Sequence, residues 1–196
     1  MIWVVLLGVV LVAFWVVSVY NFFVSAKARI KAAIQEIGNQ LKRQADLIPN
    51  LEESAKGYLK HEKKIYADLT EARKAISAAV KSQDPQKMAD AGSKLAAVLP
   101  NIQVVVESNP ELKASEVVSK LMDELRDTAD KLMYARRLVI DLTADYNVKR
   151  ATFPSNIIAG MFNMEEMKGM IMGEAEESES RKVKESDTKT PKVDLE

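Results

Sequence analysis

The sequence predicts an all-α protein in which an N-terminal transmembrane helix continues into an antiparallel four-helix bundle. Three observations predict this fold. Residues 2–24 carry no charge and are almost wholly apolar, apolar positions then recur at alternating steps of four and three residues, and only seven glycines and six prolines occur in 196 residues. We expect a transmembrane anchor over 1–26, the bundle over 27–152, an apolar Met-rich segment near the membrane over 153–173 and a disordered tail over 174–196.

The anchor is predicted from length and composition. As a helix, the run from Ile2 to Val24 would extend roughly 34 Å, enough to cross a hydrocarbon core of ~30 Å. Trp3 lies at one end, and Trp15 and Tyr20 lie toward the other, as interfacial aromatic residues do. We therefore expect one span, which contacts membrane lipid.

A cleaved signal peptide is the alternative, because residues 24–26 are small enough for a peptidase. However, a signal peptide has a basic n-region and a shorter apolar stretch. Basic side chains follow the run and none precede it: Lys27, Arg29, Lys31, Lys42 and Arg43. This asymmetry predicts a single-pass protein of the inner (plasma) membrane with its bundle in the cytoplasm.

Four apolar stripes predict the bundle helices. The first comprises Ile30, Ile34, Ile37, Leu41, Ala45 and Ile48, and the second Leu51, Ala55, Tyr58, Glu62, Ile65, Leu69, Ala72, Ile76 and Ala79. The third comprises Met88, Ala91, Leu95, Val98, Ile102 and Val105, and the fourth Val118, Leu121, Leu125, Thr128, Leu132, Ala135, Val139, Leu142 and Tyr146. Steps near 3.5 residues favour shallow, coiled-coil-like packing within one chain; an extended dimeric coiled coil is the alternative.

Proline and capping residues separate these stripes. We expect Pro49 to end the first helix and Asn50 to begin the second in a capping box with Glu53. The third helix should begin at Asp84 and Pro85. Pro100 should kink or split that helix, and the pair at 109–110 should form the next turn.

Up-and-down order brings Tyr146 back to the side where Lys27 leaves the membrane. Residues 157–172 follow there, and read as one helix they place four apolar residues on a shared face: Ile157, Met161, Met164 and Ile171. We expect this face to contact the bilayer or the top of the span. Folding back over the end of the bundle is the alternative.

Composition excludes several classes of function. Lys+Arg and Asp+Glu number 28 each, so no net field attracts nucleic acid. Cysteine is absent, which excludes disulfides and thiol catalysis. His61 is the single histidine, so His61-Glu62 cannot form a two-histidine zinc site. We expect no catalytic residues, no cofactor and no metal.

The run from Gln40 to Leu51 and several short motifs stand in a recognisable order: Tyr20-Asn21, Lys56-Gly57-Tyr58, His61-Glu62, Ala72-Arg73, Ala135-Arg136-Arg137, Tyr146-Asn147 and the run from Phe153 to Gly160. These residues carry a resemblance of the chain to the LemA family. It covers roughly residues 1–165 and implies a bacterial membrane protein with a four-helix bundle, without an established molecular function. Relatives suggest roles in organising membrane compartments or beside membrane proteolysis components. After Met161, methionines replace the aromatic-rich ending of the family.

Two further groups of residues are candidate sites. Glu62 interrupts the second stripe, so we interpret it as a buried acid paired with Arg43, Arg73 or Arg136, with a binding role as the alternative. The second group is a possible interaction patch at the membrane-distal end of the first hairpin, and a capping set around Pro49 explains it equally well: Lys42, Arg43, Asp46 and Asn50.

The function that these observations favour is a non-enzymatic, membrane-anchored scaffold for protein–protein interaction or membrane organisation, with unknown protein partners and a possible homo-oligomer. The alternatives are an adaptor for membrane proteolysis or envelope stress, and an enzyme or metal site that the sequence does not reveal.

Overall fold

The structure is a computed structural model that describes residues 1–59 and 62–170. Every regular element in these residues is a helix: α1 (Ile2–Ser54), α2 (Lys56–Leu59), α3 (Lys63–Ser82), α4 (Pro85–Ser108), α5 (Pro110–Ala114), α6 (Glu116–Ala151) and α7 (Ser155–Met161). The prediction of an all-α fold, with an apolar N-terminal helix that continues into packed helices, is confirmed. His61, Ile171 and the expected tail over 174–196 lie outside the described residues.

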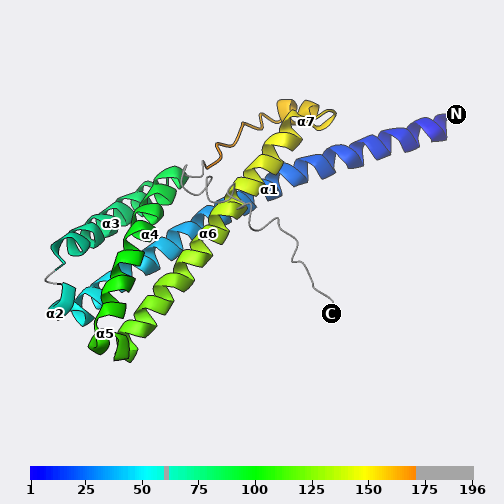
Figure 1. The fold of residues 1–196 in the computed structure, drawn as a ribbon. Coiled ribbons are helices and arrows are strands. Elements are labelled where there is room, and N and C mark those ends of the chain that lie inside the picture. The colour runs from blue at the N-terminus through cyan, green and yellow to red at the C-terminus, as the bar shows by residue number, and fades with distance from the viewer. Residues whose placement is uncertain (60–61, 171–196) are drawn as a thin grey trace, which may run out of the picture.

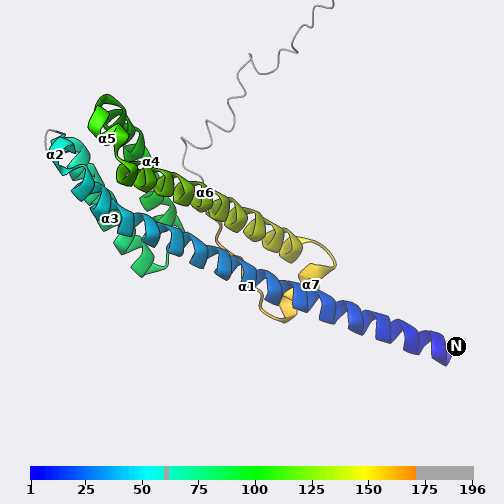
Figure 2. The same cartoon turned by 90° about the horizontal axis from the view of Figure 1, so that it is seen from below.

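The long helices run alternately away from and back toward the N-terminal part of α1. Helices α1 and α6 lie side by side, and α3 and α4 form a hairpin that packs beside them (Figures 1 and 2). The first part of α1 extends alone beyond the other helices. The ammonium of Lys27 lies 6.0 Å from the centre of the Tyr146 ring, so the prediction that the chain returns to this side is confirmed.

The predicted apolar stripes form the core. All residues of the first, third and fourth stripes are buried or half-buried. The most deeply buried include Ile37, Leu41, Leu95, Ile102 and Leu125. At about 25 cal/mol per Å² of apolar surface, burial of each large side chain contributes about 1.5–3 kcal/mol. The stripe pattern therefore determines which face of each helix turns inward.

The start of α4 agrees with the sequence. The carboxylate of Asp84 accepts hydrogen bonds from the backbone N–H groups of Gln86 and Lys87, at 2.9 and 3.1 Å, and Pro85 occupies the first helical position. Pro110 begins α5, as expected for the turn at 109–110. Pro100, in contrast, lies inside α4 without splitting it.

The expectation that Pro49 ends the first helix is wrong. Helix α1 continues through Pro49 to Ser54, so Asn50 is not an N-cap and forms no capping box with Glu53. Proline removes only one helical hydrogen bond here, a little over one turn before the helix ends. Ile48 and Leu51, on either side of it, are completely buried and hold the last turns against the core.

The interpretation of Glu62 as a buried acid is also wrong. Glu62 is exposed and stands at the N-cap of α3. Helix α1 ends at Ser54 and α3 begins only at Lys63, so the spacing counted from Leu51 still holds at the buried Ala55 but no longer determines the position of Glu62.

The three bases considered as partners of Glu62 have other neighbours. Arg43 pairs with Glu124, and Arg73 lies near Glu52. Arg136 is buried on α6, where it donates to the carbonyl of Ala89 and to the hydroxyl of Ser93 on α4. Polar contacts between helices are thus made by Arg43 between α1 and α6 and by Arg136 between α4 and α6.

Candidate interaction sites

A second, smaller core joins residues 19–30 of α1 to the end of α6 and to α7. It consists of Val19, Phe23, Ala26, Ile30, Tyr146, Ile158, Ala159 and Met164, and we call it the cap cluster. Phe23 and Tyr146 are fully buried and meet edge to face, with ring centres 5.3 Å apart. Cleavage before Lys27 would remove Val19, Phe23 and Ala26 and expose the remainder.

The turn between α6 and α7 is closed by a serine. The hydroxyl of Ser155 is buried and donates toward the carbonyls of Lys149 and Thr152, at 2.6 and 2.9 Å. Phe153, at the tip of this turn, is 75% exposed. The turn thus directs α7 back across α1 (Figure 2) and leaves Phe153 at the surface.

The expectation of one helix over 157–172 is wrong. Helix α7 ends at Met161, and Asn163 has a positive φ of 48°, a left-handed conformation that asparagine tolerates better than most residues. Residues 163–170 then run back over the bundle without regular structure, and we call them the strap. Met164 and Met170 in the strap are buried, so these methionines pack on the bundle.

Two polar side chains of α6 hold the strap. The Asn147 amide nitrogen donates to the Met167 carbonyl at 2.8 Å, and its amide oxygen accepts from the Met167 N–H at 3.0 Å. Arg150 Nε donates to the Met164 carbonyl at 2.8 Å. Asn147 therefore satisfies both backbone groups of one strap residue. The motif Tyr146-Asn147 marked this position in the sequence, but nothing in the pattern identified its partner.

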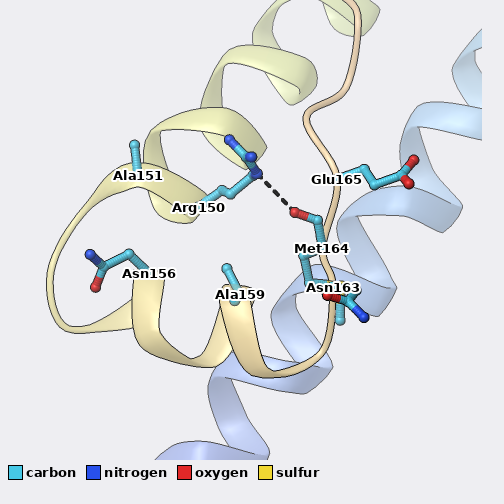
Figure 3. A pocket seen from close by; sticks show the side chains of 8 residues that line it. Arg150, Ala151, Asn156, Ala159, Asn163, Met164 and Glu165 are labelled. Atoms are coloured by element: carbon cyan, nitrogen blue, oxygen red, sulfur yellow. Dashed lines mark hydrogen bonds between the residues drawn. The ribbon is translucent and has the colours of Figure 1, made fainter.

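An open pocket of about 620 Å³ lies between the end of α6, α7 and the strap (Figure 3). Its polar side chains are those of Arg150, Asn156, Asn163 and Glu165. The guanidinium of Arg150 already binds the Met164 carbonyl and lies 3.7 Å from a carboxylate oxygen of Glu166. In the described part of the chain, no three His, Cys, Asp or Glu side chains gather to hold a metal ion. The pocket is a polar recess beside the strap.

The structure separates the four residues expected to contact the membrane. Ile157 and Met161 are exposed on α7, at 52% and 71%, whereas Met164 is buried in the cap cluster. Ile171 lies outside the described residues. Two of the four predicted residues thus lie on an accessible surface, and Phe153 and Phe162, which the helical spacing did not identify, are exposed beside them.

The possible interaction patch lies on α1 at the end far from the N-terminus, and all four of its residues are exposed. Arg43 turns toward α6, where its guanidinium donates to the Glu124 carboxylate. Lys42, Asp46 and Asn50 are spaced four residues apart, so they share one helical face. These three side chains make this face of α1 polar, whereas Arg43 points away from it and joins α1 to α6.

Two ionisable groups near this distal end have altered pKa values. Partial burial raises the pKa of Glu52 from its ordinary value, although the neighbouring Arg73 cation opposes the shift. A hydrogen bond to Glu111 raises the pKa of the Tyr58 hydroxyl, because deprotonation would place two anions together. The Tyr58 contact joins α2 to α5 and closes the distal end of the molecule.

Comparison with known proteins gives one family. The family model described as the LemA family matches residues 33–184. The match begins within α1, contains all the later helices and includes the strap. None of the curated proteins that we compared matches the chain.

Proposed function

The chain belongs to the LemA family, and we propose that it is a non-enzymatic, membrane-anchored scaffold that holds a helical surface at a fixed height above the bilayer for protein partners. The observation that carries this proposal is the continuity of α1, which extends from Ile2 to Ser54 without a break. Its residues 2–15 are exposed and apolar, and its last turns are part of the main core. One rigid element thus serves as both anchor and core helix.

A membrane-crossing α1 is the first part of this proposal. In the described residues α1 is the one helix long and apolar enough to cross a bilayer. Basic residues after the apolar run favour a cytoplasmic bundle in the inner membrane. A reporter that is active only after export, fused after Tyr146, should be silent; strong activity would contradict this orientation.

A partner-binding surface is the second part. We propose the exposed face formed by Lys42, Asp46 and Asn50, because it lies far from the apolar end of α1 and all three side chains are exposed. An adaptor for membrane proteolysis would use the same surface with a protease as its partner. The identity of the captured protein separates the two roles.

Capture from detergent-solubilised membranes tests the proposal. Exchange of charge, by Lys42→Asp with Asp46→Lys, keeps the net charge and should abolish capture of the partner, whether that is another protein or a second copy. The matched control exchanges Asp127 and Lys131 on α6, an exposed ion pair at the same spacing, and should retain capture. If the wild-type chain captures nothing and remains monomeric, or if both exchanged variants capture equally, the proposed surface is wrong.

A further inference from the structure

The apolar run of α1 is partly used inside the protein. Val19 and Phe23 belong to the charge-free run that ends at Val24, yet both are buried in the cap cluster, at 4% and 0% exposure. The part of α1 before Val19 that projects beyond the other helices extends roughly 25 Å at 1.5 Å per residue, less than a hydrocarbon core of ~30 Å. If α1 crosses the bilayer, the difference brings the cap cluster to the lipid boundary.

The surface of the protein at this level is apolar. Residues 151–164 contain no charged side chain, in a chain in which 29% of residues are charged. The exposed members of this stretch are large: Phe153, Ile157, Met161 and Phe162, at 75%, 52%, 71% and 46% exposure. We call residues 152–162, with these four side chains, the apolar corner. A corner of this kind in water would expose apolar surface that burial in lipid removes.

The surrounding residues have the order expected across a membrane interface. The Phe162 ring lies 4.8 Å from that of Tyr20 on α1, so the corner adjoins the apolar run directly. The ammonium of Lys149 lies 5.8 Å from the Phe22 ring centre, and that of Lys27 lies beside Tyr146. Basic side chains thus begin about where the apolar surface ends, within reach of lipid phosphates.

We propose that the apolar corner is a second lipid-binding site, seated at the boundary between headgroups and acyl chains in the leaflet that faces the bundle. This inference depends on the proposed membrane crossing by α1. Its partner is the bilayer itself: Phe153, Ile157, Met161 and Phe162 enter the acyl region, and Lys27 and Lys149 lie among the phosphates. The corner fixes the depth of the span and its rotation about its own axis.

Single cysteines test whether the apolar corner lies in lipid, because the natural chain contains no cysteine. Ile157→Cys and Met161→Cys place a thiol in the corner, and Tyr134→Cys, at a 71% exposed position of α6, is the control. The full chain is reconstituted in phosphatidylcholine–phosphatidylglycerol vesicles and labelled with a charged maleimide. Thiolate formation is unfavourable in lipid, so the corner thiols should react at least about tenfold more slowly than the control. The control shares the same bundle, so mixed orientation in the vesicles affects all three equally.

A second probe distinguishes lipid from protein as the covering partner. In a background that carries Trp3→Phe and Trp15→Phe, the fluorescence of Phe153→Trp should be quenched by lipids brominated near the headgroup, and that of Tyr134→Trp should not. Equal labelling of all three cysteines would place the corner in water, and slow labelling without lipid quenching would show that protein covers it; either result overturns the proposal. Failure of the wild-type chain to float with vesicles would instead contradict the anchor itself.

Discussion

Replacement of Asn147 by alanine should release the strap while the helices remain folded. The variant loses two hydrogen bonds, one to the N–H and one to the carbonyl of Met167. Each is worth about 1 kcal/mol net, so the free energy of local opening should fall by about 2 kcal/mol. That change corresponds to a roughly 30-fold faster exchange of the Met167 amide hydrogen.

Hydrogen exchange of the solubilised chain, resolved by peptide, measures this effect. Exchange should accelerate in residues 163–170, whereas the core amides of α1 and α6 should exchange as in the wild type. Asn147→Asp provides a graded variant, because a carboxylate still accepts from the Met167 N–H but cannot donate to the carbonyl. It should lie between the wild type and alanine.

Asn156→Ala is the matched control. Asn156 is exposed at the edge of the pocket, and its removal should leave exchange in the strap unchanged. If Asn147→Ala has no effect on Met167, the strap is held by its methionines alone and the role assigned to Asn147 is wrong.

Three further variants test packing and charge. Arg136→Ala removes the buried donor to Ala89 and should lower the free energy of unfolding in urea by about 2–4 kcal/mol; a change below about 0.5 kcal/mol would contradict the assigned contact. Gly92→Val should cost about 1–3 kcal/mol in the same assay, because a β-carbon at Gly92 would lie 2.7 Å from Leu132; an unchanged midpoint would show that the leucine moves aside. Burial raises the pKa of Glu52, so the ionised carboxylate opposes folding, and Glu52→Gln should melt at a higher temperature than the wild type at pH 7. This advantage should vanish below about pH 4.5, because the wild-type carboxyl is then protonated in both the folded and the unfolded state. A difference in melting temperature that persists in acid would contradict this cause.

The sequence predicted the parts of the fold that depend on periodic burial. The stripes through Leu41, Leu95 and Leu125 identified the buried faces, and the three reversals between four long helices brought Tyr146 back beside Lys27. These features are determined within each helix, where spacing alone decides which side chains face inward.

The errors arose where tertiary contacts outweigh local signals. Pro49 is a strong local stop, but the buried Ile48 and Leu51 carry α1 past it. The second stripe is buried at Leu51 and Ala55 and again from Ile65 to Ala79, but the interruption before α3 leaves Glu62 outside it. The Asn147 contact with Met167 joins residues that no periodicity relates, so only the structure reveals it.

If α1 crosses the bilayer as proposed, its continuity couples the orientation of the span to the position of the distal end of the bundle. From Lys27 to Ser54 the helix extends about 42 Å beyond the apolar run. A tilt of the span by about 20°, as a change in bilayer thickness produces, would swing its far end by about 14 Å. The face formed by Lys42, Asp46 and Asn50 lies near that end, so a small change in the lipid around Trp15 would be read out as a large displacement of whatever the distal end holds.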